Sequence, residues 1–405
     1  MAFGRTSSLR DELDRAFAER PFSVTFWDGE RLPSTTGDGP TLAIQSPGAI
    51  AHVLRAPGQL GLGRAYVSGL IEVDDLDAAL SMLDNWKPPP MSRPTRALLA
   101  LAAVRACGLI RPPSRPSTEL RLRGARHSKK RDARAVRHHY DVSNDFFQLL
   151  LDRSMTYSCA IFSRGATTLE EAQEVKLELV CKKLGLEPGE RVLDVGCGWG
   201  SFEIHAATRH GVHVVGITLS EPQAALARQR VDAAGVGDRV DIRVMDYRDL
   251  VDERFDAVAS IGMVEHVGNN QIDVYARRLA SLLRPGGRLL NHGITRLRHG
   301  DPEAGSFSNR YVFPDAAPLH LSRVLMALER AGFVTDHVEG FGGDYVRTLQ
   351  HWQRHVDERL DDAVRLAGAE RARIWRLYLR AARRGFEGGF TSIYQVLCHA
   401  EPSVR

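Results

Sequence analysis

An apolar segment at residues 260–268, SIGMVEHVG, ends abruptly in a carboxylic acid and an imidazole, Glu265 and His266. We expect a strand to lead into this segment. A carboxylate at a buried strand end is costly unless something binds it. Glu265 therefore either meets a bound group or forms a structural salt bridge. Because adjacent residues of a strand point to opposite faces, we expect His266 to be a structural neighbour.

The second candidate site is the glycine-rich segment DVGCGWGSF, residues 194–202, which directly follows the apolar sequence RVLDV. Glycines at 196, 198 and 200 allow a ligand to approach the backbone closely. Their G-x-G-x-G spacing differs from the G-x-G-x-x-G that holds a pyrophosphate at a helix N-terminus. A preceding helix, the Asp before the glycines and the turn LLRPGGRLL at 282–290 resemble the class I S-adenosylmethionine-dependent methyltransferases. A nicotinamide-dependent oxidoreductase and glycines that serve only packing are the alternatives.

The elements around these segments alternate between strand and helix from about residue 166 onward. A helix is expected to begin at Thr168, where Glu171 completes a capping-box spacing, and to end near Gly185. Such alternation predicts an α/β fold, a Rossmann-like parallel sheet with helices on both faces. The predicted strands are residues 191–195, 212–218, 240–246, 255–263 and 287–295.

Two proline-rich breaks, NWKPPPMSRP from Asn85 and RPPSRPST from Arg111, bracket an apolar helix expected at 97–110. Before them, short strands, an Asp28-Gly29 turn and a helix after Pro47 predict a small α+β domain. We therefore expect three parts: an N-terminal domain at residues 1–115, a basic linker at 116–136 and a methyltransferase domain at 137–405.

The sequence RLRGARHSKKRDARAVRHHY, residues 121–140, is rich in Lys, Arg and His, with only Asp132 to offset them. It is either a solvated linker helix or a surface attracted to anionic phospholipid headgroups, where each basic residue adds about 1 kcal/mol. Nucleic acid is the weakest reading because no nucleic-acid module accompanies the charge. The net charge of +4 also gives no general indication of nucleic-acid binding.

Five cysteines lie scattered at 107, 159, 181, 197 and 398, without C-x-x-C spacing. Neither a disulfide framework nor a metal site is expected, and a reducing compartment fits best. The N-terminal segment lacks the apolar core of a signal peptide, and residues 97–110 are too short, with Arg105 among them, to cross a bilayer. We expect a cytoplasmic protein.

Six separated motifs narrow the family: HHYDVSNDFFQLLLDRSMTYSCAIF, DVGCGWG, GITLSEPQ, SIGMVEHVG, RYVFPD and DYVRTLQHW. In this order, from about residue 137 to the C-terminus, they resemble the cyclopropane-fatty-acyl-phospholipid synthases and the enzymes that modify mycolic and other unsaturated acyl chains. LGRAYVSGLIEVD, residues 62–74, resembles the lipid-binding domain of the longer synthases.

The resemblance implies that S-adenosylmethionine is the cofactor. The implied cofactor-binding positions are Tyr157, Ser158, Asp194, Gly196, Gly198, Gly200, Thr218, Leu219, Ser220, Gln223, Asp246 and Tyr247. Each residue also has a structural reading: Tyr157 as a packed aromatic side chain, for example, and Gln223 as a solvated residue in the first turn of a helix.

The resemblance further implies a bound bicarbonate ion that acts as the base. The implied residues around it are Cys159, Glu265, His292, Ile294 and Tyr345. Glu265 would accept a hydrogen bond from the ion, while His292 and Tyr345 would donate to it. His292 as a core histidine bonded to backbone is the alternative. Cys159 is not expected to be a covalent nucleophile, because an alkene offers it no electrophile.

The implied reaction transfers a one-carbon unit to the cis double bond of an unsaturated phospholipid acyl chain. An alkene is a weak nucleophile, so positioning must supply much of the acceleration, and the carbocation formed requires a dry, aromatic pocket. Loss of a proton from the added methyl gives a cyclopropane, whereas a preceding hydride shift gives a methylene branch; the runner-up product is therefore an acyl chain of the mid-chain methylene or methyl-branched type. Sequence motifs separate these products poorly.

Two other functions are open: a noncatalytic lipid-binding protein, and a methyltransferase acting on a soluble small molecule. For the leading function we expect peripheral association with the inner face of an anionic membrane and no nucleic acid. The sequence leaves room for a homodimer.

Overall fold

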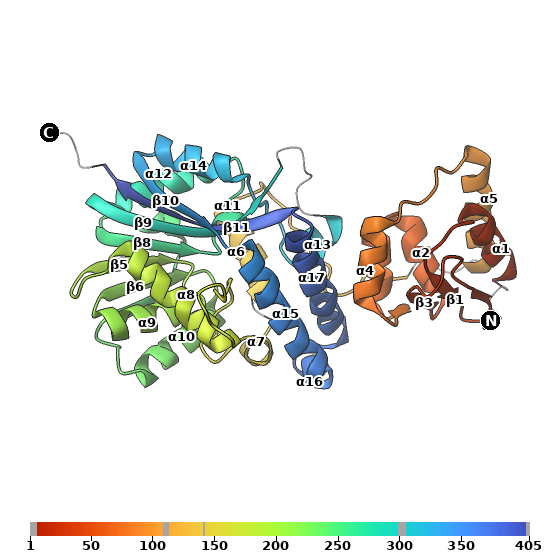
Figure 1. Cartoon of the computed structure of the whole chain (residues 1–405), viewed down its shortest axis with the longest axis horizontal. Coiled ribbons are helices and arrows are strands. Elements are labelled where there is room, and N and C mark those ends of the chain that lie inside the picture. Colours follow the sequence, from red (N-terminus) through yellow and green to blue (C-terminus); the bar gives the residue numbers. More distant parts are fainter. Residues whose placement is uncertain (1–5, 108–112, 141, 299–304, 402–405) are drawn as a thin grey trace. The chain divides into compact units, whose positions relative to one another are not determined.

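The computed structural model describes residues 6–107, 113–140, 142–298 and 305–401 (Figure 1). The chain forms two compact units, Met1–Glu119 with Gly368–Ala381, and Leu120–Ala367 with Ala382–Arg405. This division differs from the predicted boundaries in two respects. Most of the basic segment belongs to the second unit, where Arg131 pairs with Asp315. A segment of the C-terminal region, Gly368–Ala381, belongs to the first.

The first unit contains a four-stranded sheet in the order β2-β1-β3-β4, with helices around it. The Asp28-Gly29 turn lies between β1 and β2, with Gly29 at φ +87°, and α2 begins at Pro47, as predicted. The predicted helix at 97–110 is α5; residues 108–110 lie outside the described part. The elements are α1 Ser7–Ala16, β1 Ser23–Thr25, β2 Arg31–Leu32, β3 Thr41–Ile44, α2 Pro47–Arg55, α3 Gln59–Val67, β4 Ile71–Val73, α4 Leu76–Asn85 and α5 Arg93–Cys107.

The second unit contains a seven-stranded sheet in the order β10-β11-β9-β8-β5-β6-β7. β7, β6, β5, β8 and β9 run parallel, whereas β11 is antiparallel to both of its neighbours. The strands are β5 Arg191–Val195, β6 His213–Thr218, β7 Val240–Val244, β8 Phe255–Ile261, β9 Leu283–Arg296, β10 Phe333–Gly340 and β11 Thr391–Ala400. All five predicted strands are present, and the Rossmann-like α/β fold is confirmed.

Helices cover both faces of this sheet (Figure 1). Apolar side chains of α12 and α14 pack on one face, and those of α8, α9 and α10 pack on the other. The helices are α6 Lys129–Tyr140, α7 Asn144–Leu150, α8 Leu169–Leu184, α9 Ser201–His210, α10 Glu221–Ala233, η1 Tyr247–Asp249, α11 Val264–Val267, α12 Ile272–Leu282, α13 Ser306–Tyr311, α14 Leu321–Arg330, α15 Gly342–Glu358, α16 Leu360–Ala367 and α17 Ala369–Glu387.

Helix α8 has the termini that its sequence predicts. The Thr168 hydroxyl oxygen accepts a hydrogen bond from the backbone N–H of Glu171, and the Glu171 carboxylate accepts one from the backbone N–H of Thr168. Gly185 ends the helix in the left-handed conformation, which glycine adopts without the Cβ penalty. Local sequence signals therefore suffice to predict where this helix begins and ends.

The segment after β8 is not the strand end that we expected. β8 stops at Ile261, and residues 264–267 form the short helix α11. Glu265 and His266 still point in different directions, but the helical turn and not strand alternation is the reason. Among the described residues, no helix combines the length and apolar character needed to span a membrane.

Candidate active site

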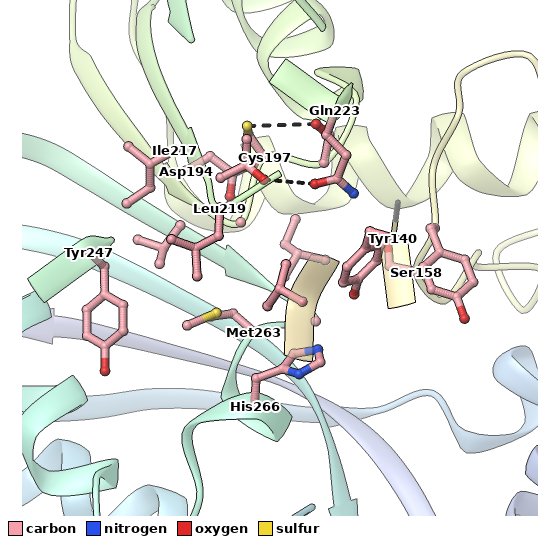
Figure 2. Close-up of a pocket in the computed structure, with 18 of the residues that line it drawn as sticks. Tyr140, Ser158, Asp194, Cys197, Ile217, Leu219, Gln223, Tyr247, Met263 and His266 are labelled. Carbon is pink, nitrogen blue, oxygen red and sulfur yellow. Dashed lines mark hydrogen bonds between the residues drawn. The ribbon is translucent and has the colours of Figure 1, made fainter. Parts of the chain in front are cut away.

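A cavity opens at the carboxyl ends of β5, β6 and β8, whose last residues Val195, Thr218 and Ile261 all line it. Figure 2 shows Tyr140 and Tyr247 on opposite sides of the cavity, with Met263 and His266 reaching it from the turn after β8. The chain leaves β5 toward β6 on one side and returns to β8 on the other. Ligands of open parallel sheets bind at such switch points.

The glycine loop forms one wall of the cavity. Gly196 and Gly198 have φ angles of +104° and +55°, which side chains other than glycine rarely adopt. A Cβ at Gly198 would meet no protein atom within 4 Å, so the loop exposes bare backbone there. Gly200 does not line the cavity: its Cβ would lie 3.3 Å from Ala227, and it therefore serves the packing of α9 against α10.

The segment after β6 supplies a polar pair. The Thr218 hydroxyl donates to Oε1 of Gln223 at 2.8 Å, and both residues line the cavity with Leu219. Ser220 does not line it. Its hydroxyl accepts from the backbone N–H of Gln223 and caps α10, which fixes the start of the helix.

The segment after β7 holds an acidic residue beside an aromatic one, Asp246 and Tyr247, and both line the cavity. Arg248 donates to both Asp246 carboxylate oxygens, at 2.8 and 2.6 Å. Burial opposes ionisation of Asp246, but the hydrogen bonds from Arg248 hold the pKa of this carboxyl below its ordinary value. Asp246 is thus an ionised, oriented acceptor.

Tyr157 and Ser158 line the cavity next to a buried lysine that the sequence analysis did not single out. The ammonium of Lys176 donates to the Ser158 hydroxyl at 3.0 Å. Burial lowers the pKa of Lys176 to about 8 and raises that of Asp194 to about 7. The buried carboxyl of Glu203 hydrogen-bonds to Asp194, so the two carboxyls share a proton and do not both ionise.

Ten of the twelve predicted cofactor residues thus lie around one cavity, and Gly200 and Ser220 lie behind it. The sequence analysis missed Tyr140, Lys176 and His266 as lining residues. Lys176 occurs within a helical sequence that carries no motif, Tyr140 belongs to a quoted motif whose resemblance implied no role for it, and His266 was expected to face away from the site because a strand was expected there.

The predicted catalytic residues do not line this cavity, but two of them are joined directly. Oε1 of Glu265 accepts a hydrogen bond from the backbone N–H of Ile294 at 2.7 Å. β8 pairs with β9 only as far as Ile261 and His292, so the carboxylate continues the ladder where the strand has ended. The predicted salt bridge of Glu265 is not present among the described residues.

Phe341 connects the other three predicted residues. Its carbonyl oxygen lies 3.8 Å from Sγ of Cys159 and accepts from the backbone N–H of Tyr345, while its ring centroid lies 6.2 Å from that of His292. The ring of Tyr345 packs edge-on against Trp352 and Phe386. The five predicted residues therefore come from one region of the second unit, between β9, α11 and α15.

Two buried polar atoms in this region lack partners among the described residues, Oε2 of Glu265 and Nε2 of His292. Buried polar groups are normally hydrogen-bonded, so an unpaired pair is a sign of a missing ligand or water. Burial raises the pKa of Glu265 to about 7 and lowers that of His292 to about 3. Burial also raises the pKa of Cys159 well above its ordinary value, which leaves a neutral thiol and not a nucleophile.

Aromatic rings lie close to the cavity. The ring of His139 stacks on Phe313 with centroids 3.9 Å apart, and Tyr140 contacts Tyr157 and His266 at 6.1 and 6.3 Å. Rings of this kind stabilise positive charge on their faces. Phe146 and Phe147 of α7 are fully buried.

Comparison with known proteins identifies the family. The family model described as mycolic acid cyclopropane synthetase matches residues 127–396, well over half of the chain. The chain belongs to the mycolic acid cyclopropane synthetase family. A probable fatty acid methyltransferase of Mycobacterium tuberculosis is 40% identical over 98% of this chain and 95% of its own length.

Other members of the family are similar over most of their length. The cyclopropane-fatty-acyl-phospholipid synthase of Escherichia coli is 33% identical, over 88% of this chain and 87% of that one. The crystal structure of mycolic acid cyclopropane synthase CmaA1 complexed with SAH and CTAB is also 33% identical. It covers 66% of this chain and 98% of its own, with a TM-score of 0.63. The chain is thus an S-adenosylmethionine-dependent methyltransferase of the mycolic acid cyclopropane synthetase family.

Proposed function

We propose that the protein transfers a one-carbon unit from S-adenosylmethionine to the cis double bond of an unsaturated phospholipid acyl chain and forms a cyclopropane. The observation that carries the proposal is that Glu265 Oε2 and His292 Nε2 are both buried without a partner among the described residues. Glu265 precedes the cavity-lining His266, and His292 pairs across the sheet with the cavity-lining Ile261. A methyltransferase that acts on a heteroatom of a soluble substrate has no evident need for such a pair.

The cofactor supplies an electrophilic methyl group when bound. The exposed glycine backbone and the Thr218–Gln223 pair fit its polar groups. Asp246 suits hydroxyl donors, and the ring of Tyr247 suits a flat heterocycle. The hydrogen bond from Lys176 holds the Ser158 hydroxyl in position.

The base in our proposal is a bicarbonate ion held by Glu265, His292 and Tyr345, with Cys159 and Ile294 beside it. The two unpaired atoms fit such an ion, because the N–H of a neutral imidazole donates a hydrogen bond and a carboxylate oxygen accepts one. The Ile294 N–H already donates to Glu265, so Glu265 is held in place from its other oxygen. A neutral His292 orients a proton acceptor without adding a charge to the region.

A second product is a methylene branch at the former double bond, which becomes a methyl branch only after reduction by a separate two-electron donor. The higher identity to a fatty acid methyltransferase, 40% against 33% for the phospholipid synthase, favours it. Both products require the same cofactor cavity and base, so they differ only in which hydrogen moves before the proton leaves.

Expression of the chain in a bacterium without such an activity tests the proposal. We expect unsaturated fatty acids to gain the mass of one CH₂ unit. Mild catalytic deuteration then separates the products, because a methylene branch takes up deuterium whereas a cyclopropane does not. Unchanged fatty acids at confirmed expression, with cofactor binding intact, would contradict the proposal.

Access to lipid is the remaining requirement, and we propose that an anionic membrane surface delivers it. On α6, Asp132, Val136 and Tyr140 line the cavity. Lys130, Arg134 and Arg137 recur at positions i, i+4 and i+7 of the same helix and are exposed, so they share its opposite face. A basic face on a wall of the cavity fits electrostatic attraction to anionic headgroups.

The first unit also presents an apolar stripe. Leu98, Leu101 and Val104 recur on one side of α5 at 50%, 44% and 54% exposure, between Arg96 and Arg105. Apolar residues flanked by arginines favour an interfacial position on a bilayer. This stripe supports the proposal that the N-terminal unit contacts lipid.

A further inference from the structure

Helices α8 and α9 bring together four side chains that the proposed reaction does not use. Cys181 and Glu178 lie one turn apart on α8, and His205 and His210 lie on α9. A sulfur, two imidazole nitrogens and a carboxylate are the donors that zinc prefers in proteins. This cluster is not recognisable in the sequence, because 24 or more residues separate the cysteine from the histidines.

The distances within the cluster are those of a loosely formed coordination sphere. One donor atom each from Cys181, His205 and His210 lie within 4.8 Å of one another. Oε2 of Glu178 lies 3.1 Å from Nε2 of His205 and 3.1 Å from Nε2 of His210. Ideal tetrahedral zinc bonds place oxygen and nitrogen ligands about 3.3 Å apart, and sulfur and nitrogen about 3.6 Å apart. The widest of these pairs would therefore have to close by at most about 1.5 Å.

The cluster is accessible from solvent on one side only. Glu171, Glu174, Glu178, His205 and His210 line a surface depression over it. Cys181 is fully buried at its base, while the side chains of His205 and His210 are 10% and 18% exposed. Arg209 also lines this depression and pairs with Glu174, and Lys182 pairs with Glu178, so a cation at this site must compete with Lys182 for Glu178. The buried thiol of Cys181 provides a soft ligand.

We propose that Cys181, Glu178, His205 and His210 form a binding site for one Zn²⁺ ion, separate from the active site. Three or four protein ligands on two helices join α8 to α9. The same helix α8 carries Lys176, whose ammonium holds Ser158 at the cofactor cavity. The ion therefore stabilises the helix that positions a wall of this cavity, and it takes no part in the chemistry. The alternative is an ion pair in which Glu178 simply bridges two histidines.

Titration of the metal-free full-length protein with Co²⁺ and Zn²⁺ distinguishes the two. With Co²⁺ we expect a thiolate-to-metal charge-transfer band and the strong visible absorption of tetrahedral cobalt, both abolished by one equivalent of Zn²⁺. Calorimetry should show one Zn²⁺ bound per chain, and Zn²⁺ should raise the melting temperature.

Three variants and one control assign the ligands. His210→Ala and Glu178→Gln should each weaken Zn²⁺ binding about tenfold or more, and Cys181→Ser should remove the charge-transfer band. His213→Ala, an exposed histidine three residues beyond His210, should bind like the unaltered protein. Because His210 and Glu178 are partly exposed, their variants are expected to fold, which circular dichroism checks.

The proposal is overturned if cobalt gives no thiolate band, or if His210→Ala and His213→Ala bind Zn²⁺ equally. A melting temperature that Zn²⁺ leaves unchanged would also contradict it and would leave the ion pair as the explanation. None of these readouts depends on enzymatic activity, so they stand whatever the lipid product proves to be.

Discussion

Oε1 of Glu265 accepts a hydrogen bond from the backbone N–H of Ile294 at 2.7 Å, at the point where β8 has ended and β9 continues. The carboxylate takes the place of the backbone acceptor that a longer β8 would supply. One oxygen is thereby fixed to the sheet, and the other is buried without a partner among the described residues. We therefore assign a structural role to Oε1 of Glu265 and a role in the proposed reaction to Oε2.

Replacing Glu265 by Gln tests the chemical half of this role. The amide oxygen can still accept from Ile294, so folding and cofactor affinity should be nearly unchanged. Turnover should fall about 100-fold or more, the usual range for loss of acid–base assistance. Steady-state kinetics with cofactor binding by calorimetry measure both. Equal losses of affinity and turnover would show that the residue acts through the cofactor cavity instead.

Activity should rise with pH through about 7. Burial raises the pKa of Glu265 to about 7, so the ionised form that accepts a hydrogen bond predominates only above this value. His292, with its pKa lowered to about 3, stays neutral throughout. The measurement is turnover against pH at saturating cofactor and constant bicarbonate, because burial also raises the pKa of Asp194, which lines the cofactor cavity, to about 7.

The same shift has a consequence for stability with the opposite sign. The folded-state pKa of Glu265 lies above its unfolded value of 4.5, so its contribution is fully present below pH 4.5 and is lost as the pH rises through 7. In Glu265→Gln the activity limb near 7 should disappear, and the loss of stability should become smaller but not vanish, because the raised pKa of Asp194 contributes a loss over the same range. A limb that persists in the variant would assign it to another group.

Gly293→Ala tests how tightly α11 is held against β9. A Cβ at Gly293 would lie 2.2 Å from Cγ1 of Val264 and 3.6 Å from Oε2 of Glu265. We expect destabilisation by about 1–3 kcal/mol, typical of overpacking, and reduced turnover as Glu265 is displaced. Chemical denaturation and kinetics measure these effects. Gly343→Ala on α15 is the control, since its Cβ meets no atom within 4 Å and stability should be unchanged or slightly raised.

Ser220 and Gln223 were assigned to one cofactor segment, but the structure separates their roles. Ser220→Ala removes the N-cap of α10 and should lower the free energy of unfolding by about 1 kcal/mol, with little change in cofactor affinity. Gln223→Ala should do the reverse, because its amide lines the cavity and accepts from Thr218. Cofactor titration and denaturation of both variants decide; identical effects would contradict the separation.

The basic face of α6 predicts how the protein meets membranes. Changing Lys130, Arg134 and Arg137 to Glu should abolish salt-sensitive binding to anionic vesicles, because about 1 kcal/mol is lost for each basic residue. Arg254, Arg277 and Arg330, exposed elsewhere on the second unit, give a control with the same change in net charge. Co-sedimentation measures binding. Equal loss in both variants would indicate a dependence on net charge alone.

Much of this architecture could be predicted because its signals are local. The capping box at Thr168, the glycine loop and five apolar strands each specify their structure within a few residues. The segment around Glu265 could not be predicted in this way, because nothing in VEHV distinguishes a strand from one turn of helix. The helical turn depends on the early end of β8 and on the hydrogen bond from the Ile294 N–H to Glu265. The Cys181 cluster was missed because helix packing alone brings its members together.

Helix α17 carries a practical consequence for anyone dissecting this enzyme. Its residues up to Ala381 belong to the first unit, where Arg373 donates to the Tyr66 and Ile71 carbonyls, while the remainder belongs to the second. A truncated chain that begins near residue 120 would keep this helix but lose the partners that shelter Ile374, Trp375 and Leu379. Such a fragment would expose an apolar surface that promotes aggregation. This aggregation should not be mistaken for an intrinsic inability of the catalytic part to fold.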